Sequence, residues 1–80
     1  MGHLVRLSEM ERAQHGIVTK VLAPDHIKRR LFGMGIREHS TIGMIRKTLF
    51  GNTMHIVLDH HTHLIIRQID ASNIWVRLGT

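Results

Sequence analysis

The sequence contains no cysteine and no tyrosine, only one proline and one tryptophan, and no long hydrophobic run. Without cysteine the chain can form neither a disulfide framework nor a thiolate metal cluster. No apolar stretch approaches the roughly 18 residues that a membrane-spanning helix requires. The two phenylalanines and one tryptophan are too few for the aromatic stacking that single-stranded nucleic acids and proline-rich peptides use. These absences favour a small soluble domain that binds by some other chemistry.

A chain of 80 residues is long enough for one domain, residues 1–80, and too short for two. Its hydrophobic content of 42% is sufficient to form a core. The opening residues, MGHLVR, lack the apolar stretch of a signal peptide, so we expect no secretion signal.

Catalytic patterns are missing as well. There is no cysteine nucleophile, the serines and aspartates are isolated, and the six acidic residues do not pair within any motif. Gly33-x-Gly35 lacks the further glycine and lysine of the phosphate-binding loops. We therefore expect a protein that is not an enzyme.

The net charge is +5, from 11 lysines and arginines against six acidic residues. Such a field favours anionic partners, either nucleic acid or an acidic protein surface. The basic residues are spread along the chain, and the only run is Lys28-Arg29-Arg30. A solvated basic surface would give the same composition.

Alternating and β-branched patterns predict a mostly β fold with tight turns. A capping box at Ser8-Glu9-Met10-Glu11 predicts a short helical turn before Gly16. Asp25 is a suitable N-cap for a helix over residues 26–32 that ends at Gly33 and Gly35. The five predicted strands cover residues 17–22, 41–48, 53–59, 63–67 and 74–78, with a single turn at 70–72. Together they predict a small five-stranded barrel closed around Leu31, Ile56, Ile66 and Val76.

Three segments in register resemble the FeoA family, small accessory proteins of the bacterial ferrous iron transporter. Residues 30–36 (RLFGMGI) resemble its R-L-x-x-[LM]-G-[IL] signature, and residues 50–52 (FGN) resemble its hairpin turn. Residues 66–76 (IRQIDASNIWV) resemble its L-R-x-x-x-A-x-x-I-x-V ending. The likeness covers about residues 7–78, and the opening residues 7–10 and Gly16 match its N-terminal turn. The residues that match the family signature are Arg30, Leu31, Met34, Gly35, Ile36, Gly51, Arg67 and Ala71.

The resemblance implies an SH3-like barrel that acts without catalysis in ferrous iron uptake. It implies a cytoplasmic protein that binds the cytosolic region of FeoB, a membrane GTPase-permease, and reaches the inner membrane only through that partner. The sequence departs from the family where Glu38-His39 replaces Pro-Gly and where His61 replaces a glycine, so loop contacts are less secure than the barrel. The candidate partner-binding residues are the basic Lys28, Arg29, Arg30 and Arg37 and the aromatic Phe50 and Trp75.

Two other functions remain open at this stage. One is a basic small barrel that binds nucleic acid, although the low aromatic content argues against it. The other is a metal-responsive sensing module, similar to the SH3-like domain of metal-dependent repressors. Assembly into a homo-oligomer also stays open.

His60-His61-x-His63 is the sharpest chemical feature of the sequence. On a strand, His61 and His63 would project to the same side about 6.6 Å apart, close enough to share one metal ion. Imidazole suits Fe(II) or Zn(II), and Asp59 or a histidine of a neighbouring subunit could complete a weak site. The competing interpretation is a solvated hairpin tip. In either case, we expect that the protein requires no cofactor for its function.

Overall fold

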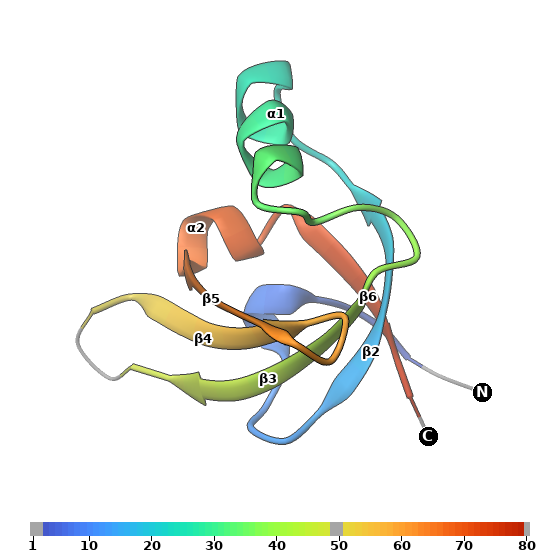
Figure 1. Cartoon of the computed structure of the whole chain (residues 1–80), viewed down its shortest axis with the longest axis vertical. Helices are drawn as coiled ribbons and strands as arrows, with labels where there is room; N and C mark the ends of the chain where they lie inside the picture. The colour runs from blue at the N-terminus through green and yellow to red at the C-terminus, as the bar shows by residue number, and fades with distance from the viewer. Residues whose placement is uncertain (1–2, 49–50, 80) are drawn as a thin grey trace.

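The computed structural model describes residues 3–48 and 51–79, which form a curved antiparallel sheet with short helices at its ends (Figure 1). Within these residues the sheet has six strands in the order β1-β6-β2-β3-β4-β5, so β1 and β5 are its edges. The elements are β1 (Leu4–Arg6), the 3-10 helix η1 (Leu7–Glu9), β2 (His15–Val21), α1 (Asp25–Gly33), β3 (Thr41–Lys47), β4 (Thr53–Leu58), β5 (Thr62–Arg67), α2 (Gln68–Ala71) and β6 (Ile74–Leu78).

The expected mainly β architecture with a short helix is confirmed, and the sheet is barrel-like without closing. It has six strands rather than five because β1 pairs with β6, from Leu4 opposite Arg77 to Arg6 opposite Trp75. The register shifts once between β2 and β6 and once between β3 and β4. Such bulges bend a strand and increase its twist, which curls the sheet around its core.

Alternation of buried and more exposed residues along the strands builds the core, and it is most regular in β4. In β4 the residues at positions 54, 56 and 58 are buried, and those between them are half-exposed. This period of two gives the sheet one apolar face, around which the barrel curls. The four residues expected to close the core are all buried: Leu31, Ile56, Ile66 and Val76.

The N-terminal turn differs from its prediction. The expected capping box between Ser8 and Glu11 is wrong: the N-cap of η1 is Arg6, two residues before Ser8, and the Arg6 N–H donates to Glu9 Oε1 at 2.9 Å. The side chain of Glu11 is therefore not the reciprocal cap. The backbone N–H of Glu11 instead donates to Gln14 Oε1 at 2.7 Å. The same chemistry recurs two residues earlier in the sequence.

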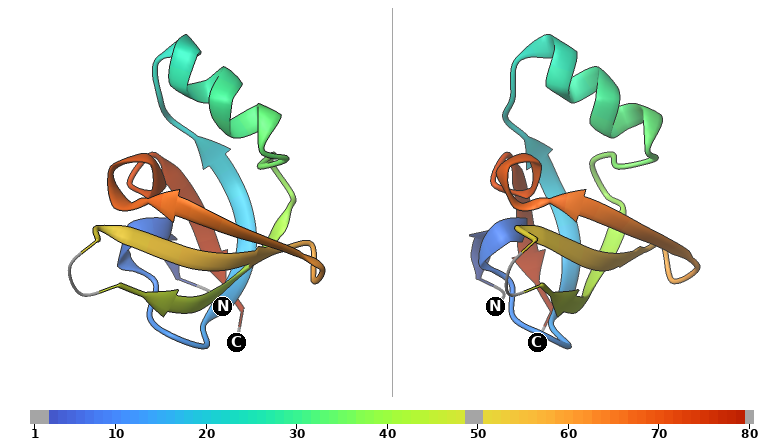
Figure 2. Two further views of the ribbon diagram at one scale, coloured as in Figure 1. Left: turned by 60° about the vertical axis from the view of Figure 1, so that its left-hand side comes forward. Right: turned by 90° about the vertical axis from the view of Figure 1, so that its left-hand side faces the viewer.

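Helix α1 stands beyond the end of the sheet rather than against one of its faces (Figure 2). It follows β2 directly and leads back to β3 through residues 34–40. Its N-cap position is Pro24, and Asp25 is its first residue, where a carboxylate interacts favourably with the helix dipole. No helix in the described residues is both long enough and apolar enough to span a bilayer.

Candidate functional site

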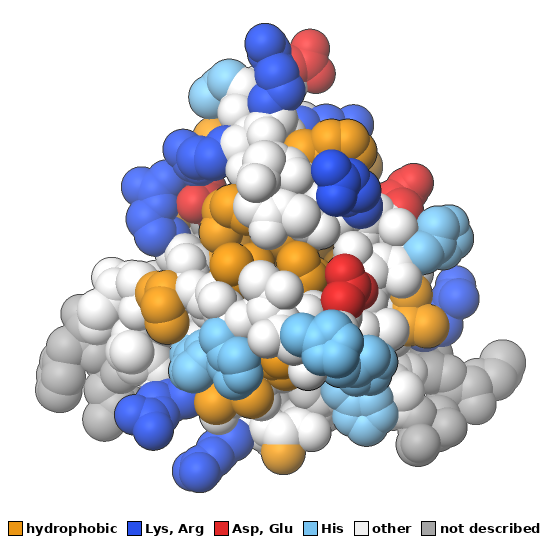
Figure 3. Space-filling model, in the orientation of Figure 1, with side chains coloured by type: hydrophobic (Ala, Val, Ile, Leu, Met, Phe, Trp, Pro, Cys, Tyr) orange, Lys and Arg blue, Asp and Glu red, His pale blue; other side chains and the backbone are white. Residues whose placement is uncertain are grey.

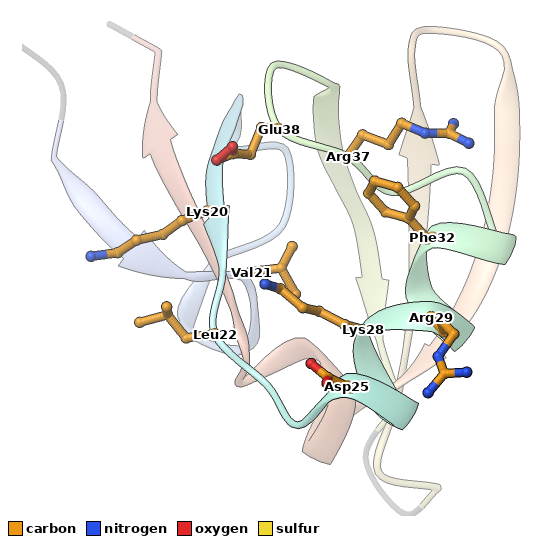
Figure 4. Close-up of a pocket in the computed structure, with 9 residues that line it drawn as sticks. All are labelled: Lys20, Val21, Leu22, Asp25, Lys28, Arg29, Phe32, Arg37 and Glu38. Carbon is orange, nitrogen blue, oxygen red and sulfur yellow. The ribbon is translucent and has the colours of Figure 1, made fainter.

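An open groove of about 960 Å³ lies between α1 and the end of β2 (Figure 4). One wall is α1, the second is the end of β2 with the residue after it, and the third is the loop that follows α1. The groove is lined by Lys20, Val21, Leu22, Asp25, Lys28, Arg29, Phe32, Arg37 and Glu38.

The groove combines exposed apolar surface with an excess of positive charge. Leu22 is 55% exposed and Phe32 is 54% exposed, although both are large hydrophobic residues. Around them are four cations and two carboxylates. Among the described residues, no ion pair joins a groove cation to a carboxylate. The groove is therefore complementary to a partner that offers apolar side chains and negative charge.

The spacing of residues along α1 explains why these side chains face the groove. Positions 25, 28, 29 and 32 recur every three or four residues, so they share one face of the helix. Ile27 and Leu31 fall on the other face, where Leu31 is fully buried in the core. The helix is therefore anchored by one face and presents the other to solvent.

The third wall of the groove, the loop that follows α1, is held in place by the turn at the end of the helix. Gly35 has φ +96°, a conformation that glycine adopts without strain. The loop that follows is tied down by two hydrogen bonds: the Arg37 N–H donates to Ser40 Oγ at 3.2 Å, and the His39 N–H donates to Val18 O at 2.8 Å. The Arg37 guanidinium lies over the Phe32 ring, 4.8 Å from its centroid, and Figure 4 shows these two side chains together. This cation–π contact holds a charge beside the exposed aromatic ring.

Behind the groove, a buried carboxylate joins α1 to α2. Asp70 Oδ1 accepts a hydrogen bond from Arg30 Nη2 at 2.6 Å, and Asp70 Oδ2 accepts one from Arg67 Nε at 3.2 Å. The Asp70 side chain is only 9% exposed. Charge-assisted hydrogen bonds of this kind are among the stronger polar contacts in proteins. Asp70 therefore helps to set where α1, and with it the groove wall, sits over the barrel.

The structure brings together only part of the predicted partner-binding set. Lys28, Arg29 and Arg37 line the groove. Arg30 points elsewhere, because it pairs with Asp70. Trp75 is half-buried outside the groove, with Arg6 5.1 Å and Lys20 5.7 Å from its ring centroid. Phe50 lies outside the described residues.

Sequence reasoning missed the apolar part of the groove. Phe32 lies four residues after Lys28, so the helical period that grouped the basic residues also places Phe32 beside them. Leu22 had no comparable signal, because its exposure depends on where β2 ends and how α1 is set against it.

The residues of the family signature occupy structural positions. Leu31, Ile36 and Ala71 are fully buried, and Met34 packs against the core while half-exposed. Gly51 lies in the turn before β4, where an added Cβ would lie 3.1 Å from Thr48 Oγ1. The remaining signature residues, Gly35, Arg30 and Arg67, act in the loop and the Asp70 contact described above.

The strand geometry behind the predicted metal pair is wrong. Strand β5 begins at Thr62, so His61 belongs to the turn and does not share a strand face with His63. Instead, His63 contacts His55 of β4, with His55 Nε2 and His63 Nδ1 2.8 Å apart. Within the described part of the chain, no group of three or more His, Cys, Asp or Glu side chains is arranged to hold a metal ion. Metal binding by His61 and His63 itself stays a prediction.

Comparison with known proteins identifies the architecture. A solved structure of an iron uptake regulatory protein (FeoA) is 26% identical, with a TM-score of 0.86, and the match covers 96% of this chain and 100% of that one. The zinc complex of FeoA from Stenotrophomonas maltophilia, a prokaryotic SH3 domain protein, is 26% identical with a TM-score of 0.72, covering 88% of this chain and 86% of that one. The SH3-like fold expected from the resemblance is confirmed.

The same fold occurs inside a larger protein. A manganese-dependent transcriptional repressor in complex with manganese has a TM-score of 0.91 at 18% identity, which shows the fold alone. That match covers 99% of this chain and 38% of the repressor. No curated protein sequence matches the chain. The model of the FeoA domain matches residues 5–78, nearly the whole sequence, and the chain therefore belongs to the FeoA domain family.

Proposed function

We propose that this protein is a non-catalytic accessory of bacterial ferrous iron uptake that docks through its groove onto an acidic cytosolic surface of a FeoB-type GTPase-permease. The observation that carries the proposal is the groove itself, whose lining combines the exposed Phe32 and Leu22 with four cations that form no ion pair with any described carboxylate. The protein then acts at the cytoplasmic face of the inner membrane through its partner, and it needs no cofactor to do so.

Family membership supports the proposed role in ferrous iron uptake. One similar structure is that of an iron uptake regulatory protein, and the Stenotrophomonas maltophilia relative has been put forward as a bacterial ferrous iron transport activating factor. Carried over to this chain, these descriptions suggest a regulator of transport rather than a carrier of iron.

The chemistry of the groove supports docking onto an acidic protein surface. Large apolar side chains that stay exposed in the free protein often become the anchors of an interface, where they are fully desolvated. Cations around such an anchor accelerate encounter with a negative surface and set its orientation more than they add affinity. Phe32 would supply the anchor, and Lys28 with Arg37 would supply the steering.

The test measures binding of the full chain to the cytosolic region of the permease by isothermal titration calorimetry. Phe32→Ser and Lys28→Glu should each weaken binding about tenfold or more, as expected for central interface residues. Arg46→Glu is the matched control, because it makes the same charge change on β3, outside the groove lining. The control should leave affinity within about threefold, since it alters only the net charge.

Two results would contradict the proposal. If Arg46→Glu weakens binding as much as Lys28→Glu, the attraction depends on net charge and not on the groove. If the unmodified chain does not bind the permease region at all, the partner assignment fails.

A further inference from the structure

Histidine side chains gather over the part of the sheet where β4 and β5 lie (Figure 3). In the antiparallel register, His55 of β4 is opposite Ile65, and His63 of β5 is opposite Val57. The two histidines are therefore diagonal neighbours on the outer face of the sheet. Their rings are 5.0 Å apart at the centroids, and His55 Nε2 lies 2.8 Å from His63 Nδ1.

The backbone holds this pair in place from both sides. Strand β4 is hydrogen-bonded to β3 on one side and to β5 on the other, so the position of His55 is fixed within the sheet. The buried residues on either side of it, Met54 and Ile56, face the core and leave His55 on the opposite face. His55 is half-buried and His63 is exposed, so the pair is ordered by the sheet and still open to solvent.

Two imidazole nitrogens that converge on one point can share either a proton or a metal ion. In the metal-free protein, one ring donates its N–H to the lone pair of the other. With Zn–N bonds of about 2.0–2.1 Å and tetrahedral angles, two ligand nitrogens lie about 3.3 Å apart. A separation of 2.8 Å reaches that value by small rotations of the two side chains, without moving the strands.

We propose that His55 and His63 form a two-histidine binding site for a divalent transition-metal ion, ligated by Nε2 of His55 and Nδ1 of His63. Imidazole ligands suit Zn(II), Ni(II), Cu(II) and Fe(II), and the order of affinities favours the later metals over iron. Water completes the coordination, since no third histidine or acidic residue joins the pair in the described part of the chain.

The surroundings make the site weaker than a structural zinc site. Arg46 of β3 is opposite His55, and its positive charge opposes a bound cation. Two protein ligands also hold a metal less tightly than the four of a structural site. The site therefore fits a metal that is exchanged rather than retained, and the proposal does not depend on how the groove is used.

The direct test is a zinc titration of the full, isotope-labelled chain followed by long-range proton–nitrogen NMR of the imidazole rings. The site predicts that Nε2 of His55 and Nδ1 of His63 shift together, with one ion bound per chain. The other imidazoles, including those of His60 and His61, should shift little over the same range. Absence of a shift at either predicted nitrogen up to millimolar zinc would overturn the proposal.

Variants separate this site from the hairpin tip predicted from sequence. His55→Gln and His63→Gln should each weaken zinc binding at least tenfold, because even the loss of an outer-sphere partner costs about 10–100-fold. The matched control, His61→Gln, removes a neighbouring imidazole and should leave affinity unchanged.

If His61→Gln instead lowers affinity as much as His63→Gln while His55→Gln has no effect, the metal binds at the tip and the inference is wrong. Backbone amide spectra of the zinc-free variants verify that each one is folded. His63 is exposed, so its variant decides the question even if His55→Gln disturbs the sheet.

Discussion

Asp70→Asn tests how strongly the buried carboxylate behind the groove holds α1 in place. The change keeps the shape of the side chain but removes its charge and replaces one acceptor oxygen with an N–H donor. That donor group faces either Arg30 or Arg67, which can only donate. At least one charge-assisted hydrogen bond, at 2.6 Å or 3.2 Å, is therefore lost inside a site where Asp70 is 9% exposed.

The expected loss of unfolding free energy is about 1–2 kcal/mol. A hydrogen bond to a charged group contributes about 1.5–3 kcal/mol. The arginine side chains are 44% and 60% exposed, so water can still solvate them after the hydrogen bond is lost. This solvation lowers the loss of unfolding free energy. A domain of this size has a total stability of about 4–12 kcal/mol, so the change is a large fraction of it.

The assay is thermal unfolding together with hydrogen exchange of the α1 amides. A loss of this size should lower Tm by roughly 5–15 °C, at about 4–8 °C per kcal/mol for a small domain. Exchange should accelerate most in α1, because Leu31 is its only fully buried residue among those described and the Asp70 contact adds a polar connection to α2. Glu38→Gln is the control, an exposed carboxylate whose neutralisation should change Tm little.

A double mutant identifies the contact responsible. If Asp70 acts through Arg30, then the losses from Asp70→Asn and Arg30→Ala should not add in the combined variant. A Tm within about 2 °C of the unmodified protein, or fully additive losses, would refute the role given to this contact.

Glycine substitutions give further predictions. Gly16→Ala should cost about 3 kcal/mol or more, because the new Cβ would lie 2.2 Å from Arg77 O and push β2 away from β6; near-normal urea unfolding would contradict this. Gly33→Ala meets open space at the end of α1 and should raise stability by about 0.5–1 kcal/mol in the same assay. Gly35→Ala forces alanine to a φ of +96° and should lower stability by about 1–2 kcal/mol, whereas an unchanged Tm would show that the turn relaxes.

Local pattern was enough to predict most of the barrel. Alternation along residues 53–58 and 74–78 placed the strands within a residue of their observed bounds, and the expected core residues Leu31 and Val76 are buried. These features depend on a period of two or on helical spacing, and both patterns can be recognised from residues that are close together in the sequence. The three-residue strand Leu4–Arg6 was missed because its formation depends on a partner strand more than sixty residues away.

The candidate site was predictable only in part, for the same reason. The basic residues of α1 follow from the helical period, whereas the pairing of Arg30 with Asp70 spans 40 residues and removes Arg30 from the groove. The contact between His55 and His63 depends on the register of two strands, which sequence spacing does not specify. Contacts fixed by register and by the placement of α1 had to come from the structure.

The most direct test of the docking account maps the contact surface on the full chain by amide chemical shifts. The labelled protein is titrated with the cytosolic region of the permease, and shift changes are recorded residue by residue. The account predicts the largest changes at the groove, from Leu22 through Phe32 to Arg37, with little change on β5. Changes concentrated on β5 or β1, with the groove unaffected, would contradict it.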